Sequence, residues 1–256
     1  MLHRPNRFKR LAELQRLDPV ADADEIYRIT ARHEFPFDHR LGLLLAFWRT
    51  FAVPSIAETL HGTGKTTEQP AQRARDTGRL MYELIDHGLD HPRGRAATRE
   101  LNRIHRQFAI SNEDYLYVLG TFIVIVPRWI DRHGWRPLCC HERAAIFHFY
   151  TKLGRRMNIV GIPRTIEAYE HYFDTFERDR FAPSVAATEL MAATKGLVAK
   201  LPRPIRPLGR HLTNALLDPA LAQATGTPRP AWWARKLLHC VLRTRARLLR
   251  HAGSPS

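Results

Sequence analysis

The chain has 256 residues, of which 44% are hydrophobic, enough to bury the core of one large domain or two small ones. This composition excludes a wholly disordered protein, and three cysteines, two of them adjacent, are too few for a disulfide framework. The formal net charge is +15, and most of it lies near the two ends. Helix-forming residues dominate and alternating β-branched runs are scarce, which predicts an all-α protein.

The first sixty residues predict two helical segments. Residues 1–40 form a helical lead-in that Pro36 ends, because DADEIYRITARHEF carries its acids early and its bases late. Residues 41–60 predict one long apolar helix, bent at Pro54. The string GTGKT that follows is similar to a phosphate-binding loop, but Thr59 stands where that motif needs its first glycine. We interpret it as a glycine-rich turn between helices.

The middle of the chain predicts several more helices. Two cover 69–87 and 96–108, with Gly88 as the C-cap of the first and a turn at DHPRGR between them. The segment 114–130 is apolar on nearly all sides, so it should be a central core helix, begun by Ser111 as N-cap. Further helices are expected over 140–153, 165–180, 183–198 and 231–249.

The end of the chain is strongly basic. Residues 200–256 hold eleven Lys or Arg and one acid, and the last helix joins Trp232 and Trp233 to an arginine-rich face. This amphipathic pattern is typical of a helix that lies on a membrane surface. The same charge could bind nucleic acid, but no known nucleic-acid motif is present, and a plain solvated face is the third alternative. We therefore expect an anionic membrane surface as partner, and no specific nucleic acid.

These features predict a division into a helical lead-in (1–40), an all-α domain (41–200) and a basic, proline-rich and amphipathic extension (201–256). No apolar leader follows the N-terminal charges, and the most apolar runs are shorter than the roughly 20 residues that span a bilayer. We expect a cytoplasmic protein that is peripheral at the inner face of the membrane.

His105 lies on the apolar face of the predicted 96–108 helix, where a lone histidine is most often a core residue. Haem iron is commonly held by an imidazole in an apolar slot, with cations for the propionates. The helix behind His105 could supply the slot, and Arg99, Arg103 and Arg106 could supply the cations. Upstream, Arg73 and Thr77 share one helix face and offer a guanidinium and a hydroxyl, although by themselves they are better explained as the solvated basic start of a helix.

The run DHGLDHPRGRAATRELNRIHRQFAISNEDYLYVLGTF, followed by RWIDRHGWRPL, HERAAIFHF and GRRMNIVGIP, resembles the MpaB and rubber (latex-clearing) oxygenase family. The likeness extends from about Tyr27 to Phe181 and is closest to the short MpaB-like branch. It implies an all-α, globin-like core that binds haem b, with a proximal histidine downstream of an Arg-x-x-x-Thr motif. Arg73 and Thr77 supply that motif, and His105 follows Thr77 by 28 positions.

The resemblance also implies roles for individual residues, and the chain departs from the family pattern at one of them. Asp76 stands where the latex-clearing branch has a lysine that acts as a second axial ligand. Glu58, fifteen positions before Arg73, is the nearest candidate for the family's glutamate base. The candidate site therefore has His105 as the haem ligand, and Arg73 and Thr77 on the oxygen side. Glu58 would be the base, and Arg103 and Arg106 would pair with the propionates.

The function implied by the resemblance is a haem b-dependent oxygenase that uses O2 to cleave a C=C bond in a hydrophobic, isoprenoid-like substrate. The competing hypothesis is a non-enzymatic, basic helical protein that binds a membrane surface or nucleic acid, with His105 merely structural. A third is a haem protein without oxygenase activity. An absorption spectrum separates the first hypothesis from the second, and oxygen consumption separates it from the third.

Overall fold

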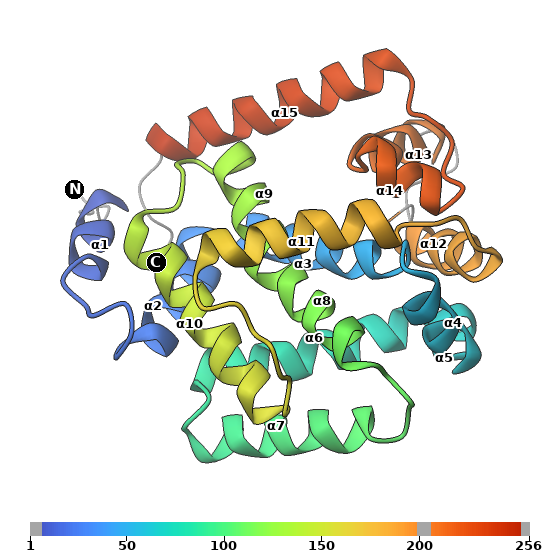
Figure 1. Ribbon diagram of the computed structural model, residues 1–256. Coiled ribbons are helices and arrows are strands. Elements are labelled where there is room, and N and C mark those ends of the chain that lie inside the picture. Colours follow the sequence, from blue (N-terminus) through green and yellow to red (C-terminus); the bar gives the residue numbers. More distant parts are fainter. Residues whose placement is uncertain (1–6, 199–205, 252–256) are drawn as a thin grey trace.

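The computed structural model describes residues 7–198 and 206–251, and every regular element in these two ranges is helical (Figure 1). The predicted all-α class is therefore confirmed. In the first half of the chain the elements are α1 (Arg7–Leu14), α2 (Ala23–Ile29), η1 (Thr30–Glu34), α3 (Pro36–Thr50), α4 (Pro54–Gly62), α5 (Lys65–Glu68), α6 (Pro70–His87) and α7 (Pro92–His105). In the second half they are α8 (Asn112–Gly120), η2 (Thr121–Ile125), α9 (Val126–His133), α10 (Cys140–Arg156), α11 (Ile166–Arg180), α12 (Val185–Val198), α13 (Arg206–Ala215), α14 (Pro219–Ala224) and α15 (Trp232–His251).

The apolar stretch predicted as one bent helix over 41–60 is two helices, α3 and α4, whose axes differ by 98°. Pro54 opens α4, because a proline lacks the N–H that would continue the preceding helix but suits a first helical turn. Pro36 likewise opens α3. The break lets α4 turn away from α3 and pack against α12, so that one apolar sequence lines two different parts of the core.

Helices α8, η2 and α9 follow one another without a gap and form the central helix that the sequence predicted. Ser111 caps it, with its Oγ accepting from the N–H of Asp114 at 3.0 Å. Pro127 cannot donate to the preceding turn, and the backbone widens into the π-helical segment η2 directly before it. The helix then continues to His133, three residues beyond the predicted end.

Helices α6 and α7 form an antiparallel pair whose turn is built on two glycines (Figure 1). Gly88 ends α6 at a φ of +72°, which favours glycine, so its predicted role as C-cap is confirmed. The predicted turn at DHPRGR is shorter than expected, because α7 already begins at Pro92. A Cβ on Gly94 would lie 1.8 Å from the carbonyl oxygen of Gly88, so the two helices meet at a distance that a side chain would prevent.

We expect Gly94→Ala to lower the free energy of unfolding by about 1–3 kcal/mol, because the added methyl group would overlap backbone atoms, which cannot rotate away as a side chain could. Urea denaturation measures the change. Gly78→Ala is the matched control: it lies inside α6, its added Cβ meets nothing within 4 Å, and it should stabilise by about 0.5–1 kcal/mol. Equal stability of the Gly94→Ala variant and the wild type would contradict the close approach.

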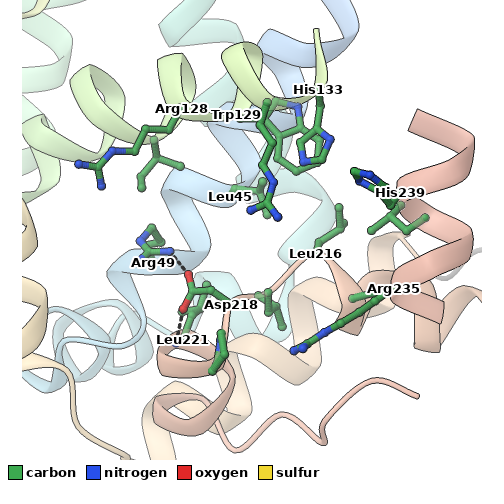
Figure 2. Close-up of a pocket in the computed structure, with 16 residues that line it drawn as sticks. Leu45, Arg49, Arg128, Trp129, His133, Leu216, Asp218, Leu221, Arg235 and His239 are labelled. Atoms are coloured by element: carbon green, nitrogen blue, oxygen red, sulfur yellow. Dashed lines mark hydrogen bonds and ion pairs between the residues drawn. The ribbon is translucent and has the colours of Figure 1, made fainter. Parts of the chain in front are cut away.

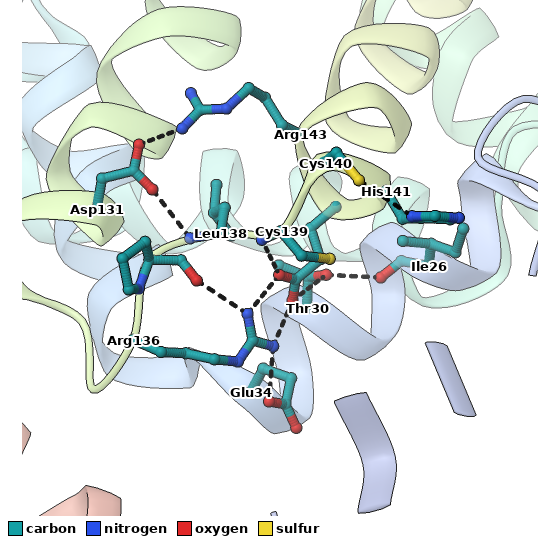
Figure 3. Close-up of polar contacts among 12 residues, drawn as sticks. Ile26, Thr30, Glu34, Asp131, Arg136, Leu138, Cys139, Cys140, His141 and Arg143 are labelled. Atoms are coloured by element: carbon teal, nitrogen blue, oxygen red, sulfur yellow. Dashed lines mark hydrogen bonds and ion pairs between the residues drawn. The ribbon is translucent and has the colours of Figure 1, made fainter. Parts of the chain in front are cut away.

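A buried ionic cluster joins the N-terminal segment to the loop before α10 (Figure 3). Arg136 donates from Nη2 to the carboxylates of Glu34 at 3.0 Å and of Glu142 at 2.8 Å. All three side chains are almost fully buried. Glu142 also accepts from the N–H of Cys139 at 2.8 Å and so caps α10. Glu142 therefore depends on Arg136 for its counter-charge in the core, whereas Glu34 also pairs with the partly exposed Arg10 at 3.4 Å.

The basic C-terminal segment packs onto the rest of the protein through α15, which lies across α9 and beside α13 (Figure 1). Arg245 of α15 pairs with buried Asp38 of α3 at 2.9 Å. Trp232 and Leu248 of the same helix are among its exposed apolar side chains. The proline-rich stretch 201–210 is predicted from the sequence to wrap over the surface; 201–205 lie outside the described residues, and 206–210 form the start of α13 instead. Among the described helices, no single one is long and apolar enough to cross a membrane; α3 and α4 meet that test only as a bent pair.

Candidate functional site

A cavity of about 240 Å³ lies between α4, α6, α7, the central helix and the end of α10. Its wall is mostly apolar and includes Ile56, Leu80, Leu101, Ile104, Val118 and Phe122. A few polar side chains converge on it, chiefly Arg73, Asp76, Thr77, His105, Asp114 and Tyr115. An apolar cavity with a small set of convergent polar groups is typical of a small-molecule site.

The α6–α7 pair explains why residues distant in sequence meet here. Thr77 lies eleven residues before Gly88, and His105 lies fourteen residues after His91. At about 1.5 Å of rise per residue, Thr77 and Arg73 lie about 16 and 22 Å from the turn, and His105 about 21 Å from it on the other helix. The antiparallel pairing thus sets His105 level with the Arg73–Thr77 face, and all three side chains line the cavity.

His105 is half-buried at the end of α7. Its Nδ1 is 2.7 Å from the carbonyl oxygen of Leu101, so Nδ1 must carry the proton and donate, which leaves the lone pair on Nε2. No described residue forms a hydrogen bond with Nε2. Burial lowers the pKa of His105, and the nearby charge of Arg73 lowers it further, so the ring is neutral at pH 7. A neutral imidazole anchored through one nitrogen has the form that binds a metal through the other.

Arg73 and Thr77 lie on α6, facing the same cavity. Burial lowers the pKa of Arg73, yet its guanidinium stays charged at neutral pH. Within the described part of the chain it makes no hydrogen bond or ion pair. The hydroxyl oxygen of Thr77 is buried and has no hydrogen-bond partner among the described residues. An uncommitted cation and an uncommitted hydroxyl beside one cavity are available to a bound molecule.

The other sequence-predicted residues lie apart from these three. Glu58 is exposed on α4 and is absent from the cavity wall, although its neighbour Thr59 lines it. Arg103 and Arg106 are exposed near the end of α7 and do not line the cavity either. Arg103 donates to Glu100 at 2.7 Å, an exposed pair within one helix. The roles suggested for these three residues remain predictions.

Sequence reasoning missed two polar residues of the wall. Asp114, whose N–H donates to the cap at Ser111, also lines the cavity, and its carboxylate accepts from Ser55 Oγ on α4 at 3.0 Å. Tyr115 lies against His105, with ring centroids 5.6 Å apart, and its hydroxyl donates to the His105 carbonyl oxygen at 3.4 Å. Both residues lie in the first turn of the most apolar helix. Polar side chains at that position must face the core or its edge, and this position could have marked them as candidates for the site.

The fold and the cavity together define an all-α protein with a largely apolar site that offers an imidazole, a guanidinium and a hydroxyl. A family model described as the catalytic domain of ER-bound oxygenase mpaB/B' and rubber oxygenase matches residues 38–251 of the chain. The chain belongs to this family of oxygenase catalytic domains, and the resemblance found in the sequence is confirmed.

Individual relatives are similar to the chain over different lengths. The ER-bound oxygenase mpaB' of Penicillium brevicompactum is 26% identical over 97% of the chain and 66% of its own length. The ER-bound oxygenase mpaB of Penicillium roqueforti (strain FM164) is 26% identical over 85% of the chain and 83% of its own length. The ER-bound oxygenase mpaB of Penicillium brevicompactum is 29% identical over 52% of the chain and 36% of its own length. The chain thus spans just under two thirds of the first relative.

Proposed function

We propose that the protein is a haem b-dependent oxygenase that cleaves a C=C bond of a hydrophobic, isoprenoid-like substrate with O2. The observation that carries this proposal is the gathering of His105, Arg73 and Thr77 on one cavity. Membership of a family of oxygenase catalytic domains supports the reaction class. The apolar wall suits an apolar substrate, since such a molecule gains by leaving water.

The donor set fits a haem group. His105 would hold the iron through Nε2, because Nδ1 is committed to the carbonyl oxygen of Leu101. Arg73 would pair with a propionate or orient a bound oxygen, and Thr77 would donate one hydrogen bond from its buried hydroxyl. The haem, when bound, would supply the binding and activation of O2. The apolar wall of the cavity would exclude water from the substrate.

The second part of the proposal is attachment to an anionic membrane surface at its cytoplasmic face. Its support is the exposed apolar face of α15, formed by Trp233, Leu237, Val241 and Leu248. Arg243 and Arg247 lie on an adjoining face of the same helix and are exposed. Such a helix lies flat in a membrane interface, and the relatives above carry the description ER-bound. Hydrophobic substrates partition into lipid, so this placement would bring them to the enzyme.

Haem reconstitution of the purified chain tests the enzymatic proposal. We expect a red protein with a Soret band at about 400 nm. We also expect oxygen uptake when a linear isoprenoid is added in detergent, and aldehyde or ketone products in which the double bond is cut. A chain that stays colourless after reconstitution would contradict the proposal. If the chain binds haem but consumes no oxygen with any isoprenoid, it is a haem protein without this oxygenase activity.

A further inference from the structure

A second cavity, of about 470 Å³, lies between α3 and α9 on one side and the segment α13 to α15 on the other (Figure 2). It shares no lining residue with the cavity of His105. Part of its wall is apolar and includes Leu45, Ile125, Trp129, Leu221 and Leu238. Its charged lining is four arginines and one acid: Arg49, Arg128, Arg132, Arg235 and Asp218.

Two of these arginines already have counter-charges. Arg49 donates to Glu177 at 2.6 Å and to Asp218. Arg128 donates to Asp174 at 2.6 Å. Asp218, the cavity's one acid, also accepts from the N–H of Leu221 at the start of α14. The donors of these two guanidinium groups are thus committed to carboxylates of the protein itself.

The other two arginines have no such partner. Arg132 comes from α9 and Arg235 from α15, and neither makes a hydrogen bond or ion pair with any described residue. Figure 2 shows Arg235 extending from α15 toward Asp218 and Leu221, into the space between the walls. The cavity therefore holds two guanidinium groups without a direct partner among the described residues, one from α9 and one from α15.

Two histidines also line the cavity. His133 of α9 packs on Trp129, with ring centroids 4.2 Å apart. Burial lowers the pKa of His133 to about 4, helped by the charges of Arg132 and His239, so it is neutral at pH 7 and adds hydrogen bonding without charge. His239 projects from α15 on the facing wall (Figure 2). The two imidazoles and the guanidinium groups give the cavity polar groups beside its apolar wall.

We propose that this cavity binds the phosphate group of an amphiphile, with Arg132 and Arg235 holding the phosphate and the apolar wall receiving the chain attached to it. Two unpaired guanidinium groups match a dianionic phosphate better than a monoanionic carboxylate. The apolar wall distinguishes the site from one for inorganic phosphate alone. The same chemistry is found in a free phosphate monoester and in a phospholipid headgroup that α15 would meet at a membrane surface.

The test uses the full chain without added haem, so its outcome is independent of the oxygenase proposal. Calorimetric titration with hexyl phosphate probes a free ester, and cosedimentation with phosphatidylcholine vesicles containing phosphatidic acid probes a headgroup. We expect Arg132→Gln/Arg235→Gln to bind its phosphate about ten-fold or more weakly, because charge-assisted hydrogen bonds from both walls are lost. Both side chains are exposed and unpaired among the described residues, so the fold should persist, as thermal melting will show.

Arg79→Gln/Arg95→Gln is the matched control, because it removes the same charge from exposed positions of α6 and α7 that line neither cavity. A selective loss of hexyl phosphate binding in the cavity variant supports the site and identifies a free ester as sufficient. If the cavity variant binds vesicles more weakly than the control does, and hexyl phosphate is not bound, the site is one for a phospholipid headgroup. Equal weakening in the two variants, or no binding of either probe by the wild type, would overturn the proposal.

Discussion

The His105→Ala variant is expected to stay colourless after haem reconstitution, whereas the wild type gains a Soret band at about 400 nm. On the proposed site, His105 supplies the nitrogen that holds the iron. Its Nε2 has no partner among the described residues, while Nδ1 donates to Leu101 at 2.7 Å. Alanine removes the ligand and leaves an apolar wall. The measurement is the absorbance of the Soret band relative to the protein band, after free haem has been removed.

Two further samples make this result specific. His171→Ala removes an exposed histidine of α11 that does not line the cavity, and it should keep the full Soret band. Imidazole added to the His105→Ala variant should restore the band in part, because the small ligand can enter the space that the side chain vacates. A variant that binds haem as the wild type does would assign the iron to another residue and leave His105 structural.

Arg136→Met should be the most destabilising substitution in the ionic cluster of Figure 3. It leaves Glu142, which is almost fully buried, without its counter-charge, and it leaves buried Glu34 with Arg10 alone. Breaking a buried ion pair by removing one partner costs about 3–5 kcal/mol, because the remaining charge cannot be solvated. Urea denaturation followed by circular dichroism should show a loss of that size in the free energy of unfolding.

An exposed ion pair provides the comparison. Arg103→Met breaks a pair with Glu100 on the surface of α7, and such pairs contribute about 0–1 kcal/mol. Adding Glu34→Gln and Glu142→Gln to the Arg136→Met variant should recover part of the lost stability, because the uncompensated charges disappear. A cost below about 1 kcal/mol for Arg136→Met alone would mean that water reaches the two carboxylates.

Local signals in the sequence predicted those features that depend on few neighbouring residues. The cap at Ser111 and the helix end at Gly88 were both found, because each is set by a short stretch of backbone. The break between α3 and α4 was expected as a bend only. Hydrophobicity does not change across Pro54, and the size of the turn depends on the packing of α4 against α12.

Neither the buried ionic cluster nor the proposed phosphate site could be predicted in this way. Arg136 lies in a loop of the sequence pattern, and its partner Glu34 is 102 positions away. The phosphate site proposed above takes its walls from α3, α9 and the segment α13 to α15. Neither feature produces a periodic or local pattern in the sequence, because each is formed by side chains from widely separated segments.

By itself the sequence determined the all-α class, the approximate extent of helices such as α6, α11 and α12, and the family, because these follow from composition, capping residues and matching motifs. It also named Arg73, Thr77 and His105, but it could not bring them together. The tertiary structure decided that they share a cavity, since an antiparallel pair of helices places residues at equal distances from its turn side by side. It also placed Glu58, Arg103 and Arg106 outside the wall, because a helix turns each residue about 100° from the last and only one face meets the cavity.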